Sequence, residues 1–114
     1  MIMKWYIAKI VFKICNGGRP QFDEHLRLIE ASSFEEAFLK ARMLGLREEV
    51  SFVNELQHPV RWEFVNVPDL YPISGLADGI ELHSHIREED EADAYVKSVH
   101  QKAVSIQLQD RPAF

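Results

Sequence analysis

The 114-residue chain contains one cysteine, Cys15, and no run of about 18 apolar residues. A single cysteine excludes an intrachain disulfide and fits the reducing environment of the cytoplasm. Without a long apolar run, we expect no membrane-spanning helix. Lys9 and Lys13 interrupt the N-terminal apolar stretch, so we expect no signal peptide. The sequence therefore predicts a cytoplasmic protein with one domain over residues 1–114 and a C-terminal extension from about residue 103.

Basic side chains are scarce outside the first twenty residues. Those residues hold Lys4, Lys9, Lys13 and Arg19 and no acid, while the whole chain has a net charge of -5. The remaining 94 residues therefore carry a charge of -9. An acidic surface is repelled by phosphate backbones, which disfavours binding to nucleic acid.

Alternating side chains predict that the chain begins with a hairpin. Residues 4–14 place apolar residues on one face and a mixture of apolar residues and lysines on the other, a pattern typical of a strand. Asn16-Gly17-Gly18 supplies a turn before a second strand candidate over 22–31. The two faces of the first strand carry Tyr6, Ala8, Ile10, Phe12 and Ile14 on one side, and Trp5, Ile7, Lys9, Val11 and Lys13 on the other.

A capping box predicts a helix over residues 34–44. The Ser33 hydroxyl would accept a hydrogen bond from the Glu36 amide, while the Glu36 carboxylate would reach back to the Ser33 amide. Gly45 stands where a left-handed C-terminal cap is expected. Apolar residues then recur at helical spacing, namely Phe34, Ala37, Phe38, Ala41 and Leu44.

The second half of the chain predicts three further strands. Residues 50–56 and 60–67 form a hairpin pattern, and two prolines favour irregular structure over 68–72. Asp78-Gly79 is a turn signal, and residues 80–86 alternate again, which predicts a fifth strand.

The C-terminal region begins with an acidic run, residues 88–93. Acids suit the first turn of a helix, and apolar residues continue at helical spacing, so we predict a helix over 88–102. Residues 104–108 fit either more helix or a short strand.

Together the elements predict an α+β fold in the order β-β-α-β-β-β-α, an antiparallel sheet of about five strands with two helices packed on one face. A helix layer covers only one side of a sheet. Trp5, Ile7 and Val11 lie on the other side, and that face is too apolar for full exposure. A homodimer that buries this face is the expected consequence.

Five short segments together resemble a family of small bacterial proteins catalogued as a domain of unknown function. The resemblance covers roughly residues 4–86 and implies a bacterial cytosolic protein. It implies no catalytic residue, and residues 88–114 are not part of it. The segments are 5–11, 28–37, 61–65, 69–71 and 78–82.

One motif could bind a metal. On a strand, Glu81, His83 and His85 would project from one face, where two imidazoles and a carboxylate suit a divalent ion. His25 is the first candidate for a further ligand. The alternative is that both histidines lie on the solvated face of an edge strand, and no HExxH or CxxC motif supports a metal. The expected cofactor is therefore none, with a divalent metal as the alternative.

Three aromatic residues are candidate binding residues, namely Trp5, Trp62 and Tyr71. Trp5 lies opposite Tyr6 on its strand, so one of the two falls outside the main core. Trp62 shares a face with Phe64 and suits the core as well as a site. Tyr71 stands between prolines, where an amphipathic ring suits a groove.

No complete catalytic set is present, so the sequence favours a non-catalytic binding module over an enzyme. We expect such a module to self-associate through its sheet and expect a second copy, or another protein, as its partner. Two alternatives are open: a small metal-dependent enzyme built on the Glu-x-His-x-His segment, and a nucleotide- or nucleic-acid-associated accessory protein.

Overall fold

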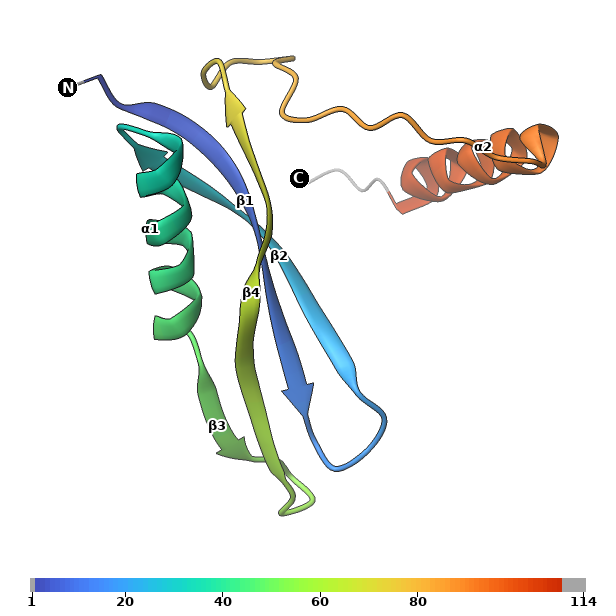
Figure 1. The fold of residues 1–114 in the computed structure, drawn as a ribbon. Coiled ribbons are helices and arrows are strands. Elements are labelled where there is room, and N and C mark those ends of the chain that lie inside the picture. Colours follow the sequence, from blue (N-terminus) through green and yellow to red (C-terminus); the bar gives the residue numbers. More distant parts are fainter. Residues whose placement is uncertain (1, 110–114) are drawn as a thin grey trace, which may run out of the picture. The chain divides into compact units, whose positions relative to one another are not determined.

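The computed structural model describes residues 2–109, and the chain divides into two compact units, Met1–Ser84 and His85–Phe114. Within the described residues, four strands and two helices are formed. All four strands and the first helix belong to the first unit, and the second helix belongs to the second (Figure 1). No helix within residues 2–109 is long and apolar enough to cross a membrane. The expectation that residues 1–114 form one domain stays a prediction.

The predicted first hairpin is formed by β1 (Lys4–Cys15) and β2 (Gln21–Ala31), which pair antiparallel from Lys4↔Ala31 to Ile14↔Gln21. Asn16 shapes the turn, because its Oδ1 accepts a hydrogen bond from the Gly18 amide at 2.9 Å.

Helix α1 (Phe34–Arg47) begins at the predicted cap. The Ser33 hydroxyl accepts a hydrogen bond from the Glu36 amide at 3.1 Å, which satisfies one free N–H of the first turn. The Glu36 carboxylate accepts a hydrogen bond from the Ser32 hydroxyl at 2.5 Å, whereas the sequence predicted a bond to the Ser33 amide. Lys40 also links α1 to the sheet, because its ammonium group donates a hydrogen bond to the backbone carbonyl of Glu30 in β2.

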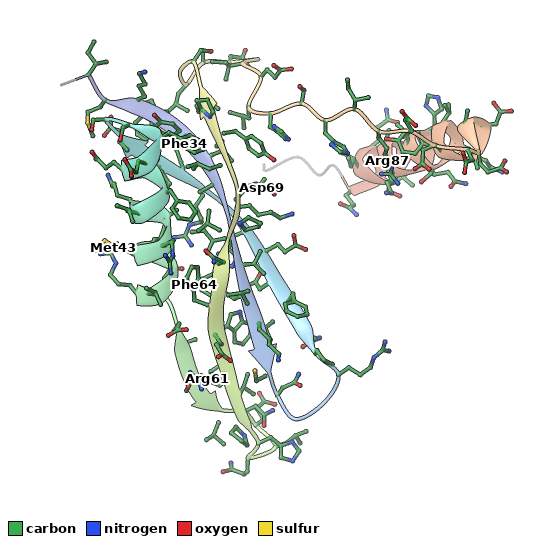
Figure 2. The ribbon with its side chains drawn as sticks, viewed as in Figure 1. Phe34, Met43, Arg61, Phe64, Asp69 and Arg87 are labelled. Atoms are coloured by element: carbon green, nitrogen blue, oxygen red, sulfur yellow. The ribbon has the colours of Figure 1, made fainter. Side chains whose placement is uncertain are left out.

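The predicted left-handed cap at Gly45 is wrong. The helix continues through Gly45 to Arg47, and its C-cap is Glu48 with a φ of -95°. Gly45 is needed for close packing instead, because a Cβ there would overlap the Phe64 ring and lie 3.2 Å from Cγ2 of Ile10. Phe64 lies between β4 and α1 (Figure 2). The glycine therefore sets how near α1 approaches the sheet.

The sheet is completed by β3 (Val50–Val53) and β4 (Pro59–Ile73), in the order β2-β1-β4-β3. β4 runs through Pro68 and Pro72, where irregular structure was predicted. β3 pairs only with residues 59–62 of β4, so the rest of β4 has β1 as its sole strand neighbour among the described residues. A proline, which has no N–H, is tolerated on such an edge.

The core lies between α1 and one face of the sheet. Tyr6, Ala8, Ile10 and Phe12 of β1 are at most 3% exposed. They pack with Ile29, Ala31, Ala37, Ala41 and Val67. The alternation predicted for β1 is therefore confirmed.

The predicted fifth strand over residues 80–86 is not formed, so the sheet has four strands. The Asp78-Gly79 turn before it is present, with Gly79 at a φ of +82° and an Ile80 amide that donates to the Ala77 carbonyl at 3.1 Å. His83 stacks on Tyr71 of β4, and Leu82 lines the same groove as Ile7 and Leu26, instead of extending the backbone pairing of the sheet. Alternation of side chains does not reveal whether a segment pairs with the edge of a sheet or lies across its face. The α+β class stands.

The second unit contains α2 (Ala92–Gln109). It starts later than predicted, after the acidic run, and continues as helix through the tail that fitted either helix or strand. Arg87 precedes the helix and ion-pairs with Glu89 at 2.6 Å, and its guanidinium lies 5.0 Å from the centre of the Tyr95 ring. The predicted helix layer over the sheet is provided in the first unit by α1.

Candidate functional site

The side of the sheet opposite α1, here called the helix-free face, is the first candidate surface. Directly paired residues of neighbouring antiparallel strands project from the same side, so the registers identify its members. β1 and β2 contribute alternate residues along nearly their whole length. The helix-free face includes Trp5, Ile7, Lys9, Val11 and Lys13 of β1, Phe22, Glu24, Leu26, Leu28 and Glu30 of β2, and Glu63, Asp69, Tyr71 and Ile73 of β4.

Apolar side chains on this face are concentrated on β2. Phe22, Leu26 and Leu28 are 56%, 70% and 43% exposed. Ile7 and Val11 continue the apolar surface onto β1, where each is half-buried. β2 is an edge strand with a neighbour on one side only. An exposed apolar edge strand is a surface on which a further strand or sheet can pack.

A groove of about 360 Å³ lies on this face, between the sheet and the segment 74–84. The His83 ring stacks on Tyr71 with centroids 3.7 Å apart and an interplanar angle of 23°. This stack holds the segment against β4. The groove is lined by Tyr71 and His83 and by the aliphatic side chains of Ile7, Leu26, Leu28, Leu76 and Leu82.

Charged residues on the helix-free face compensate one another. Lys9 Nζ lies 2.5 Å from Glu24 Oε1, and the hydrogen bond and charge of Glu24, with a smaller contribution from Asp69, raise the pKa of Lys9. Burial and a hydrogen bond with Asp69 raise the pKa of Tyr71. Lys9 is therefore already paired with a carboxylate on this face.

The structure separates the three predicted binding residues. Trp5 and Tyr71 lie on the helix-free face, and both are half-buried. Trp62 lies on the opposite face, because it pairs with Ile14 and packs against the core. The three do not form one site.

A second candidate surface is a recess of about 300 Å³ on the α1 side of the sheet, just beyond the C-terminal end of α1. The Trp62 ring lies nearly parallel to that of Phe52, with centroids 6.0 Å apart. The Phe12 ring lies 5.0 Å from that of His25. The recess is therefore lined by aromatic rings together with the polar side chains of Asp23, His25 and Glu48.

A chain of polar side chains crosses this recess. Glu48 accepts two hydrogen bonds from Arg27, at 2.9 and 2.7 Å, and Arg27 Nη1 lies 3.2 Å from His25 Nδ1. His25 Nε2 lies 2.8 Å from Asp23 Oδ2, which also accepts a bond from Trp62 Nε1 at 3.1 Å. An arginine can only donate, so His25 Nδ1 accepts and Nε2 carries the proton given to Asp23.

These contacts shift the pKa values of the acids. Hydrogen bonds from His25 and Trp62 lower the pKa of Asp23, and Arg27 lowers the pKa of Glu48. Both nitrogens of His25 are engaged, so the ring has no free lone pair for proton transfer or metal binding. This chain of hydrogen bonds thus connects β2, β4 and the end of α1. Alternation at Asp23, His25 and Arg27 was the only sequence signal for it.

The proposed metal ligands do not share a strand face. Glu81 and His83 belong to the first unit and His85 to the second. His83 stacks on Tyr71, and His25 is engaged by Asp23 and Arg27. Across the described part of the chain, no three His, Cys, Asp or Glu side chains gather closely enough to hold a metal. Metal binding by Glu81, His83 and His85 stays a prediction.

Comparison with known protein families gives a match over most of the chain. The family described as "Domain of unknown function (DUF4288)" matches residues 5–84, nearly the span of the first unit. No curated protein and no solved structure matches the chain. The resemblance inferred from the sequence is confirmed at the level of the family.

Proposed function

The chain belongs to the family described as "Domain of unknown function (DUF4288)", and we propose that it is a non-catalytic binding module that pairs with a second copy through its helix-free face. A bacterial cytoplasmic setting accords with the single cysteine, Cys15. The observation that carries the proposal is the exposed apolar row of Phe22, Leu26 and Leu28 on an edge strand.

The position of this row favours a second copy as the occupant. Leu26 lies at the midpoint of β2, so an antiparallel β2–β2 contact about a two-fold axis places it opposite its own copy. That contact would set the helix-free faces side by side in one continuous sheet. The pairing brings Leu28 opposite Glu24 of the other copy and Glu30 opposite Phe22, so no acid faces an acid across the contact.

The groove beside β2 strengthens the argument. Leu76 and Leu82 are 57% and 48% exposed, although they already pack near Leu26 and Leu28. A second copy paired along β2 would place its own Leu26 and Leu28 beside these side chains and reduce their exposure. Burial of apolar surface contributes about 25 cal/mol per Å², so exposed leucines provide most of the driving force.

The test is the mass of the full-length protein by sedimentation equilibrium, for the wild type and for Leu26→Lys. Leu39→Lys is the matched control, because Leu39 is a similarly exposed leucine (54%) on α1. We expect the wild type and Leu39→Lys to form a dimer, and we expect Leu26→Lys to stay folded but to associate more weakly than either. A wild-type monomer at high micromolar concentration, or equal dissociation by both lysines, would contradict the proposal.

A further inference from the structure

The second unit presents an interaction surface of its own. No residue of α2 is buried, and Val96, Val99 and Ile106 are 51%, 45% and 69% exposed. In proteins, most of the stability of a helix comes from packing of its apolar face rather than from intrinsic propensity. We propose that α2 pairs antiparallel with α2 of a second copy.

The spacing of the apolar residues suits a second helix. Ala92, Val96, Val99, Ala103 and Ile106 follow one another at intervals of four, three, four and three residues. That interval pattern is the seam of a two-helix coiled coil, in which each seam residue fits between residues of the facing helix. The seam continues over most of the length of α2.

The contacts of Arg87 keep Tyr95 beside this seam. The Arg87 guanidinium lies over the Tyr95 ring and is fixed by Glu89 at 2.6 Å. Tyr95 therefore packs on its own chain, and the neighbouring Val96 is left for the partner helix.

Charge selects the antiparallel direction. Five of the six residues 88–93 are acids, whereas residues 94–109 contain Lys97 and Lys102 and no acid. Parallel helices would align the two acidic runs, and like charges side by side are destabilising. Antiparallel helices instead bring the acidic end of each copy toward the lysines of the other.

The seam and the charges together define a register. With Val96 level with Val99 of the other copy, Ala92 lies level with Ala103. Lys102 then lies close to the level of Asp93 of the other copy. The small side chains of Ala92 and Ala103 permit close approach of the helix axes, because the interaxial distance depends on the side chains at the contact.

Cysteine cross-linking of the full-length chain tests direction and register together. In a Cys15→Ser background, Ala92→Cys and Ala103→Cys are made separately, one of them is isotope-labelled, and the two are mixed and oxidised mildly. A disulfide needs Cα atoms within about 7 Å. In the antiparallel register, two copies of residue 92 lie about 16 Å apart along the axis, since they are 11 residues out of step at about 1.5 Å each.

We expect intact-mass analysis to find the mixed disulfide and little of either homodisulfide. Gln101→Cys is the control, because residue 101 lies on the side of the helix away from the seam. Homodisulfides from each variant alone would overturn the antiparallel direction. Cross-linking no greater than that of Gln101→Cys would overturn the pairing itself.

The same mixture in the Leu26→Lys chain separates this pairing from the sheet contact. The helix disulfide is expected to persist there, because its surface lies wholly within α2. Its loss in that chain would overturn an independent helix pairing. A monomeric wild type with no cross-link would contradict both proposals, whereas a cross-link that survives Leu26→Lys supports this one even where the sheet contact fails.

Discussion

The two faces of β1 differ in how completely they are covered. On the α1 side, Ala8, Ile10 and Phe12 are at most 1% exposed. On the helix-free side, the alternating Ile7 and Val11 are only half-buried, and their neighbours on β2 are exposed. β1 therefore contributes one face to a fully buried core and the other face to an apolar surface that stays partly exposed in the first unit.

Two phenylalanines illustrate how differently the two faces are covered. Phe12 and Phe22 are the same residue type on adjacent strands, yet Phe12 is 1% exposed and Phe22 is 56% exposed. The first stabilises the unit by itself. The second contributes little to the core, and the proposed contact with a second copy would bury it further. We therefore expect substitutions on the α1 side to change the stability of the fold, and substitutions on the helix-free face to change self-association.

The largest expected effect comes from removing each of these rings. Phe12→Ala should destabilise the protein by about 3–5 kcal/mol, because it deletes a fully buried ring. Phe22→Ala should change the free energy of unfolding of the monomer by less than about 1 kcal/mol and weaken the dimer instead. Urea unfolding at several protein concentrations measures both quantities. A loss at Phe22 as large as that at Phe12, independent of concentration, would abolish the distinction between the faces.

Gly45→Ala tests the closeness of packing on the α1 side. Alanine normally favours a helix over glycine, but here the added methyl group meets the Phe64 ring, and overpacking costs about 1–3 kcal/mol. The double variant Gly45→Ala/Phe64→Leu should lose less than the sum of the single changes. Thermal unfolding of the three variants provides the measurement, and a stabilising Gly45→Ala would show that α1 moves freely on the sheet.

Ser33→Ala addresses the start of the same helix. Loss of the hydroxyl that accepts from Glu36 should cost about 1 kcal/mol, equally at low and high protein concentration. Chemical denaturation gives this value directly. A change of less than about 0.3 kcal/mol would show that the cap contributes nothing measurable.

The smallest effect concerns the polar chain on the α1 side. The pKa of Asp23 is lower in the folded state than its usual 3.8, so its contribution is present above about pH 4 and is lost as pH falls through the folded-state pKa. The stability difference between wild type and Asp23→Asn should narrow between about pH 5 and pH 3. Asp23 is more than a third exposed, so solvent screens the effect. A difference that widens on acidification would contradict the assigned hydrogen bonds.

The sequence correctly predicted those elements that depend on residues close together in the chain. Ser33 and the alternation of β1 specify their structures within a few residues, and both predictions are confirmed. Gly45 was misassigned because its role depends on Phe64, 19 residues away in the sequence. The strand predicted over 80–86 was wrong because alternation does not reveal whether a segment pairs with a sheet edge or crosses its face.

The candidate surfaces were harder to predict for the same reason. Trp5, Trp62 and Tyr71 were chosen together by residue type, but only the register of β1 with β4 reveals that Trp62 faces the core. The series of hydrogen-bonded side chains from Glu48 to Trp62 joins three elements that no local sequence pattern connects. The apolar character of the helix-free side was visible in Trp5, Ile7 and Val11, although the most exposed side chains lie on β2.

Concentration-dependent NMR spectra of the full-length protein test the helix-free contact most directly. On dilution, resonances of Leu26 and Leu28 on β2 should shift together along one binding curve, while those of Leu39 on α1 stay fixed. That result would locate self-association on the helix-free face. Dilution shifts confined to α1, or no shift on β2 across the micromolar range, would contradict it.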